Sequence, residues 1–259
     1  MSTVIYPSPV FGPIHSRRLG VSLGINLLPA DGKWCSFDCI YCECGLNASH
    51  RAKLPLPTRE QVSEALEARL RQMKLEGPAP DVLTFAGNGE PTLHPHFPEI
   101  VNEVCRLRDH YFPDAKISVL SNSTQVHLPR VREALMRVDN AIMKLDTACA
   151  DYIHLVDRPQ GHYDLETLIE NLHRMAPHLI IQSMFMRGTL NGRNVSNVSP
   201  EYVDPWLKAV RRIGPHRVMI YTIDRETPIA TLAKAGHDEL DDIAARVEAE
   251  LGIPCSVSY

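Results

Sequence analysis

A long apolar run is missing from this chain of 259 residues. No stretch approaches the roughly 20 apolar residues that a helix needs to cross a bilayer. The first residues, Met-Ser-Thr-Val-Ile-Tyr-Pro, also lack the charged start and the apolar segment of a signal peptide. The sequence therefore predicts a cytoplasmic protein that has no membrane segment.

An excess of basic residues is missing as well. The chain carries 27 Lys and Arg against 31 Asp and Glu, which gives a formal net charge of −4. This balance disfavours a dedicated nucleic-acid-binding protein with a uniformly basic surface, and it leaves room for a local basic patch. The fractions of hydrophobic residues (44%) and charged residues (22%) are typical of a globular protein with a core.

Cysteine is present in an uneven pattern. Disulfides are not expected in a reducing cytoplasm, so the odd number of cysteines needs no explanation. Their positions in the chain are what can indicate a function. Four of the seven lie close together and three stand apart: Cys35, Cys39, Cys42 and Cys44 against Cys105, Cys149 and Cys255. Cys149 is the outlying thiol nearest the expected site, and its role stays open.

After residue 20, apolar runs alternate with amphipathic stretches, which is the pattern of a βαβ protein. Strands are expected over residues 21–28, 81–86, 116–120, 141–145, 179–186, 217–223 and 254–258. Helices are expected between them, over 58–77, around 100–107, and over 129–138, 165–172, 200–213 and 238–251. We therefore predict one α/β domain over 21–259, with about six βα units and a closing strand, and an extension over 1–20 packed on it. Six units fall short of the eight in a complete TIM barrel.

The segment Cys35-Ser-Phe-Asp-Cys39-Ile-Tyr-Cys42 follows the first expected strand. Soft thiolates favour iron–sulfur clusters, zinc or copper(I). A structural zinc site normally has four ligands in paired spacings, whereas here the spacing is three, then two, without a second pair. Three thiolates on a 4Fe–4S cluster would leave one iron open. Zinc and ordinary buried thiols remain alternatives, and Cys44 is awkwardly close to act as a fourth ligand.

This spacing resembles the signature of the radical S-adenosylmethionine (SAM) superfamily, with Tyr41 in the family's usual aromatic position. The resemblance implies a partial (β/α)6 TIM-like barrel whose site lies at the C-terminal strand ends. It also implies a 4Fe–4S cluster on Cys35, Cys39 and Cys42, whose open iron binds the amino and carboxylate groups of SAM. Reduction by a donor such as flavodoxin or ferredoxin would then release a 5′-deoxyadenosyl radical that abstracts hydrogen from a substrate.

Gly87-Asn88-Gly89-Glu90-Pro91 ends the second expected strand. It resembles the family's Gly-Gly-Glu-Pro motif, which holds the methionyl amino group of SAM, with Asn88 in place of a glycine. We expect backbone carbonyls to make this contact, and asparagine tolerates a left-handed backbone better than most residues. Glu90 is expected either to orient the amino group or to anchor the loop.

Six further residues at the ends of expected strands are candidates for SAM binding: Ser121, Asn122, Lys144, Asp146, Gln182 and Ser183. The first two resemble a Thr-Asn-Gly segment near the ribose and carboxylate of SAM, and a plain turn is the alternative. Lys144 and Asp146 point to one side of their strand, where they could contact SAM carboxylate and ribose, or form a salt bridge at the barrel rim.

The segment Gly12-Pro-Ile-His-Ser-Arg17-Arg18-Leu-Gly20 indicates one branch of the superfamily. It is similar to the lead segment of Fe–S oxidoreductases related to wyosine-type tRNA-modifying proteins. The two arginines could clamp phosphate or carboxylate groups, or tie the extension to acidic residues of the barrel.

The substrate stays open among an RNA base, a small metabolite and a partner protein. Two other functional classes also remain. One is a non-catalytic metal-binding or regulatory protein on the same scaffold. The other is a metal-independent barrel enzyme that uses Glu90 and Asp146 as an acid–base pair.

Overall fold

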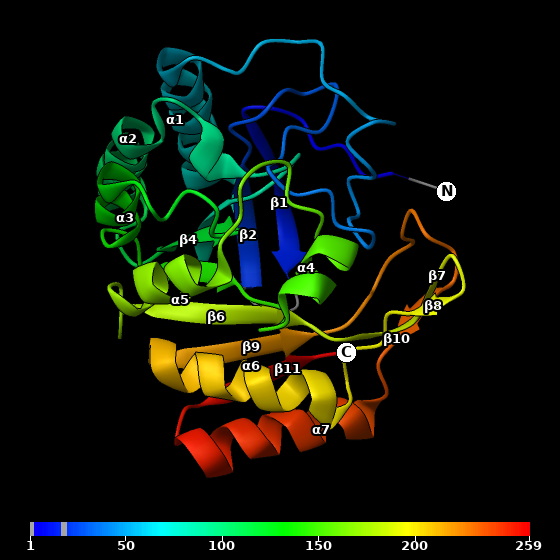
Figure 1. Cartoon of the computed structure of the whole chain (residues 1–259). Helices are drawn as coiled ribbons and strands as arrows, with labels where there is room; N and C mark the ends of the chain where they lie inside the picture. Colours follow the sequence, from blue (N-terminus) through cyan, green and yellow to red (C-terminus); the bar gives the residue numbers. More distant parts are fainter. Residues whose placement is uncertain (1–2, 17–19) are drawn as a thin grey trace.

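A curved sheet with helices on its outer side forms the body of the protein. The computed structural model describes residues 3–16 and 20–259, where eight strands are paired in the order β1-β2-β3-β4-β5-β6-β9-β11 (Figure 1). β1 (Val10–Ser16) is antiparallel to β2 (Gly20–Ile25). The remaining neighbours are parallel, through β3 (Val82–Phe85), β4 (Lys116–Ser121), β5 (Asn140–Lys144), β6 (Leu179–Met184), β9 (Arg217–Tyr221) and β11 (Cys255–Ser258).

The helices follow the strands in the predicted alternation. They are α1 (Arg59–Glu76), α2 (Phe97–Tyr111), α3 (Pro129–Leu135), α4 (Ala150–Val156), α5 (Leu165–His173), α6 (Pro200–Ile213) and α7 (His237–Arg246). The strand direction turns steadily from β1 and β2 to β9 and β11, while α1, α2, α3, α5, α6 and α7 cover the outer side (Figure 1). The predicted α/β class with a partial (β/α)6 barrel is confirmed, because each strand of β2–β6 and β9 is followed by helical cover before the next.

Local sequence explains where several helices begin and end. Thr58 and Gln61 form a capping box at the start of α1, as each side chain bonds to the backbone N–H of the other. Pro200 opens α6 at a position where no helical N–H is needed, and Gly214 ends it in a left-handed conformation. The last predicted helix is divided, since a π-helical turn (Val247–Leu251) follows α7.

Five of the strands and helices were not predicted from the sequence. β1 lies in the predicted extension and adds an antiparallel edge strand to the sheet. α4 has only seven residues, too few for a clear helical repeat. The predicted strand over 179–186 ends at Met184, and β7 (Met186–Leu190) then joins a separate sheet with β8 (Arg193–Asn194) and β10 (Leu232–Lys234).

The two faces of the large sheet carry different side chains. Outward-facing residues such as Leu83, Phe85 and Val119 belong to one large buried cluster with the helices. A cavity lies on the inner side, beside four small residues of β2, β3 and the residue after β3: Ser22, Gly24, Thr84 and Ala86. TIM barrels normally fill this space with bulky branched side chains, so small residues here leave room for a ligand.

None of the helices within the described ranges is long and apolar enough to cross a membrane.

Candidate active site

The three motif cysteines lie in a loop between β2 and α1, which we call the cysteine loop (residues 33–51). The loop is closed at its base, where Lys33 N–H donates to His50 O at 2.6 Å. It is also joined to the glycine turn, since Trp34 N–H donates to Asn88 O at 2.8 Å and Glu90 N–H donates to Trp34 O at 3.1 Å. The cysteine motif and the glycine turn, separate in the sequence, are therefore one hydrogen-bonded unit.

The end of α4 holds the other side of the cysteine loop. Ile40 N–H donates to Val156 O at 2.9 Å, and Asp38 N–H donates to Asp157 O at 3.0 Å. In the reverse direction, Gln160 N–H donates to Ser36 O at 2.8 Å. Backbone bonds from two sides therefore fix the course of the loop that carries the three cysteines.

Burial and the charges of two lysines, Lys33 and Lys144, act on the thiols. Burial raises the pKa of Cys35 to about 12 and the pKa of Cys39 well above its usual value. A hydrogen bond from Cys44 is the main cause that lowers the pKa of Cys42 to about 6. Burial opposes the charge of Lys33, but the sulfur atoms of Cys42, Cys35 and Cys39 outweigh it and raise the Lys33 pKa.

These thiols fit the role of cluster ligands. Cys35, Cys39 and Cys42 are free and half-buried, and the buried Lys33 ammonium beside them favours their thiolate forms. Cys44 is more deeply buried, and its thiol is within reach of both the Cys42 sulfur and Gly87 O, at 3.4 Å from the latter. In the described part of the chain, no group of three or more His, Cys, Asp or Glu side chains converges on a single ion position.

The glycine turn needs its two glycines for close backbone approach. Gly87 and Gly89 have φ values of 137° and 139°, which side-chain-bearing residues rarely adopt. A Cβ atom on Gly89 would lie 1.9 Å from Trp34 O, in the hydrogen-bonded contact with the cysteine loop. Any larger residue at position 89 would therefore separate the two motifs.

Asn88 contributes its side chain to the turn, and its backbone is not left-handed. Among the described residues other than glycine, positive φ occurs at Ser123, Arg158 and Asn191, so the tolerance of asparagine for that conformation is not used here. Its side chain instead accepts from Tyr6 N–H at 2.8 Å and donates to Tyr6 O and Pro29 O. Asparagine at this position thus holds the N-terminal segment against the turn, a contact that a glycine could not make.

The Glu90 carboxylate anchors the turn to the next strand. It accepts hydrogen bonds from Thr92 N–H and its hydroxyl, Ser121 Oγ and Asn122 N–H. Burial raises the pKa of Glu90 although these donors oppose the shift. Of the two roles expected from the sequence, the structure shows the anchoring one. Pro91 follows directly and opens a short 3₁₀ turn (Pro91–Leu93).

Asn122 lies against the cysteine loop. Its amide donates to Ser36 Oγ at 2.9 Å and approaches Cys35 Sγ at 3.5 Å. The segment expected to lie near SAM is therefore beside the first cysteine, while Ser121 points to Glu90.

A buried ionic network lies beside Tyr41. The Lys144 ammonium forms ion pairs with Asp146 and, at 3.1 Å, with Asp157, and it donates to Tyr41 OH. The Tyr41 hydroxyl in turn donates to Asp146. Burial raises the pKa of Asp157 to about 6, and for Lys144 the two carboxylates outweigh burial and raise the pKa. The alternative expected from the sequence, a salt bridge between Lys144 and Asp146, is present and buried.

Sequence reasoning missed Asp157, because nothing in its spacing relates it to the cysteine motif. Asp157 follows directly after α4, a short helix that the hydrophobic pattern of the sequence did not predict. The network links Tyr41 of the cysteine loop to the end of β5. Cys149 begins α4 and packs against an apolar cluster that includes Ile40 and Tyr41.

Neighbouring residues of β6 face opposite sides. Gln182 lines the cavity inside the barrel. Ser183 is fully buried on the outer side, where its hydroxyl donates to Leu145 O and accepts from Trp206 Nε1 at 2.9 Å. Of the two residues expected to reach a cofactor, only Gln182 therefore faces the cavity.

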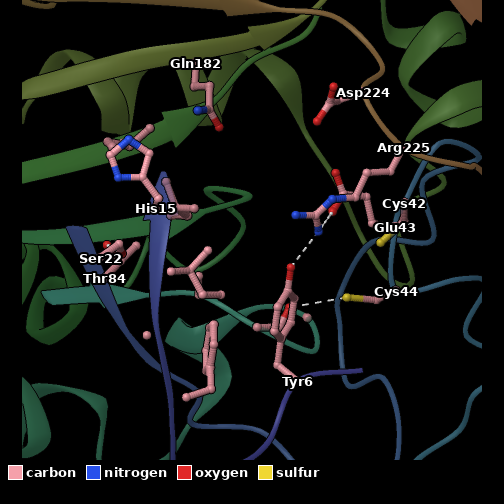
Figure 2. A pocket seen from close by; sticks show the side chains of 18 of the residues that line it. Tyr6, His15, Ser22, Cys42, Glu43, Cys44, Thr84, Gln182, Asp224 and Arg225 are labelled. Carbon is pink, nitrogen blue, oxygen red and sulfur yellow. Dashed lines mark hydrogen bonds and ion pairs between the residues drawn. The ribbon is translucent and has the colours of Figure 1, made fainter. Parts of the chain in front are cut away.

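A cavity of about 500 Å³ extends from the cysteine loop into the barrel (Figure 2). Cys42, Gly87 and Gly89 line it at one end. Residues of the N-terminal segment (residues 3–16) also line it, and the Tyr6 hydroxyl accepts from Arg225, whose guanidinium also pairs with Glu43 at 2.9 Å. Arg17 and Arg18, expected to bind anions, lie outside the described residues.

The family model described as the radical SAM superfamily matches residues 31–196. The chain belongs to the radical SAM superfamily. This membership confirms the superfamily and the enzyme class predicted from the cysteine spacing and the glycine turn, both of which lie within the matched residues.

Two relatives illustrate how widely this radical SAM sequence is shared. A UPF0026 protein of Helicobacter pylori is 31% identical over 241 residues, which cover 90% of this chain and 72% of that protein. A protein named GTPase Obg from Brachyspira hyodysenteriae is 29% identical over 251 residues, covering 96% of this chain and 35% of that protein. The chain thus spans about a third of the length of the latter relative.

Solved structures show the same fold at low sequence identity. A radical SAM methyltransferase from Sphaerobacter thermophilus matches with a TM-score of 0.66 and 16% identity, over 92% of this chain and 66% of that one. Archaeal TYW1, a wyosine-type protein, matches with a TM-score of 0.54 and 14% identity, over 88% of this chain and 71% of that one. These likenesses support the radical SAM barrel.

Proposed function

We propose that this protein binds a 4Fe–4S cluster through Cys35, Cys39 and Cys42 and uses it to cleave SAM reductively. When bound, the cluster and SAM would supply a 5′-deoxyadenosyl radical that abstracts hydrogen from a substrate. The observation that carries this proposal is the joining of the cysteine loop to the glycine turn beside one open cavity. A site of this kind can hold a cluster and a nucleoside cofactor next to each other.

The residues of the chain have distinct parts in this proposal. The backbone of Gly87 and Gly89, which both line the cavity, would receive the amino group of SAM. Lys33 would stabilise the three thiolates by its charge. Asn122 would lie near the SAM carboxylate, and the Lys144–Asp146 pair near the ribose, with Tyr41 holding both to the cysteine loop.

The partners of the reaction are part of the same proposal. Electrons would come from a donor such as flavodoxin or ferredoxin, in the cytoplasm. The substrate would be an RNA base, a small metabolite or a group on a partner protein. The absence of a membrane-crossing helix from the described ranges agrees with a reaction away from the bilayer.

Anaerobic reconstitution tests the proposal directly. The full chain would be loaded with iron and sulfide, mixed with SAM and dithionite, and assayed for 5′-deoxyadenosine. We expect product from the wild type and at least about a hundredfold less from Cys39→Ala, since one lost ligand removes the cluster. Cys105→Ala is the matched control, because that thiol lies in α2 outside the cysteine loop, and it should retain wild-type activity.

Two outcomes would contradict the proposal. One is a fully iron-loaded protein that binds SAM and releases no 5′-deoxyadenosine. The other is zinc in place of iron in protein prepared without air, which would favour a non-catalytic metal-binding protein on this scaffold.

A further inference from the structure

The two ends of the cavity differ in charge. Among the described residues, the acidic and guanidinium side chains that line it stand together at the end that holds Cys42: Glu43, Asp224 and Arg225 (Figure 2). Ser22 and Thr84 lie at the other end, which we call the inner end, away from these charges. Apolar side chains of β1 and of three other strands also line the cavity: Phe11, Ile14, Leu120, Ile142 and Met219.

Two hydroxyl groups at the inner end of the cavity can form more hydrogen bonds than they make within the protein. Ser22 Oγ and Thr84 Oγ1 are 2.8 Å apart, and both residues are more than 90% buried. Each hydroxyl carries one proton, and their mutual bond uses only one of the two. No other partner of either hydroxyl is found among the described residues, and both residues line the cavity, so the second proton is free to bond to a ligand there.

Gln182 adds a second polar group to the same cavity. Its side chain lines the space from β6, and its amide has no hydrogen-bond partner within the described ranges. An amide offers donors and an acceptor together. An apolar cavity with a few such convergent polar groups is the usual form of a small-molecule site.

The shape of the cavity depends on Gly24 and on aromatic residues of the N-terminal segment. A Cβ atom on Gly24 would lie 2.2 Å from the Phe11 ring, so the ring occupies the place of an inward-facing side chain of β2. Tyr6 stacks on Phe11 with ring centroids 4.5 Å apart. The N-terminal segment therefore forms one wall of the cavity and shapes what can enter.

We propose that the inner end of this cavity binds a neutral, carbonyl- or amide-bearing group of the substrate, with Ser22, Thr84 and Gln182 as its hydrogen-bonding residues. The proposal rests on the function proposed above only in naming the occupant as the hydrogen-donating substrate. A charged group is disfavoured at the inner end because the acidic and guanidinium side chains that line the cavity among the described residues lie at the other end; the imidazole of His15 borders the inner end and is exposed to solvent. A purely apolar group would leave the spare hydroxyl proton and the amide unsatisfied.

Three probes of similar shape separate these possibilities: benzamide, benzoate and toluene. Their binding would be measured by ligand-detected NMR on the cluster-loaded protein with SAM present and no reductant, so that no turnover occurs. We expect benzamide to bind at least about tenfold more tightly than either of the others. Equal binding of all three, or preference for benzoate, would overturn the proposal.

Variants then locate the site. Thr84→Val combined with Ser22→Ala removes both hydroxyls at nearly constant volume, and we expect the preference for benzamide over toluene to fall about fivefold or more. Thr84→Ser keeps the hydroxyl and should keep the preference. Gln182→Met tests the second group and, since Gln182 is partly exposed, it should fold even if the double variant does not. Unchanged preference in both the double variant and Gln182→Met would refute the assignment.

SAM affinity, measured in parallel, distinguishes this proposal from the proposed function. The variants should bind SAM within about twofold of the wild type if these residues contact substrate. Loss of SAM binding in Gln182→Met, with benzamide preference intact, would make Gln182 a cofactor residue and overturn its role here. Failure of the wild type to bind SAM would refute the proposed function, while probe binding could still be measured.

Discussion

The outer and inner faces of the same strands differ in what their side chains contact. On the outer face, Leu83 and Phe85 of β3 are fully buried against helices. On the inner face of the same strand, Thr84 and Ala86 border a cavity. Since alternate residues of a strand point to opposite sides, one strand serves both purposes. The outer face supplies stability, and the inner face keeps space and hydrogen-bonding groups for ligands.

The largest expected effect comes from removing a large side chain on the outer face. Phe85→Ala should lower the free energy of unfolding by about 4 kcal/mol, because it leaves a cavity beside the Phe97 ring, 5.8 Å away between centroids. Leu120→Ala on the inner face should cost only about 1 kcal/mol, since its side chain already borders open space. Chemical denaturation measures both values, and equal losses would contradict the difference between the faces.

A smaller effect is expected at the glycine turn. Gly89→Ala should lower the free energy of unfolding by about 3 kcal/mol, because backbone strain adds to the overlap with Trp34 O. Gly192→Ala is the control, because φ is 79° there and no atom lies within 4 Å of the place that a Cβ would take, so strain alone should cost about 1 kcal/mol. Gly89→Ala should also weaken SAM binding, which isothermal titration would detect. A Gly89→Ala protein as stable as the control would disprove the close contact.

The smallest effect is expected at the opposite end of the barrel. Asp139 accepts from Ile117 N–H at 2.8 Å and pairs with Arg108 at 3.0 Å. Burial opposes its charge, but these bonds and the nearby cations hold the Asp139 pKa below its usual value. Asp139→Asn should therefore cost about 1 kcal/mol at neutral pH and leave SAM cleavage unchanged.

The pH dependence of that loss has a definite sign. A carboxyl group whose pKa is lowered by folding stabilises the protein above its unfolded pKa of about 4. That stabilisation disappears as the pH falls through the lower pKa of the folded state. The difference between wild type and Asp139→Asn, followed by thermal unfolding, should therefore shrink below about pH 4. A difference that grows under acid would contradict this assignment.

The sequence was most informative where a residue's role follows from its neighbours in the chain. Alternating apolar runs predicted the strand and helix order, and Thr58 marked the start of α1 as a capping residue. The spacing of Cys35, Cys39 and Cys42 and the glycine turn predicted the superfamily. Such signals are local, so a single sequence can carry them.

Other roles depend on contacts between distant segments. Asn88 was predicted for its backbone, whereas its side chain fixes Tyr6 across the turn. Asp157 joins the network of Tyr41 and Lys144 through a helix that was not predicted. Gln182 and Ser183 were equal candidates until strand register placed them on opposite faces. None of these contacts can be predicted from the spacing of residues along the chain, because their partners are far apart in the sequence.

The amino-acid sequence by itself determined the kind of chemistry and the order of secondary structure, because thiol spacing and hydrophobic periodicity act over a few residues. Only the tertiary structure decided which polar groups share a site. Curvature of the sheet brings Ser22, Thr84 and Gln182 to one cavity from strands far apart in the chain. Packing of the whole barrel, which no short segment encodes, sets that arrangement.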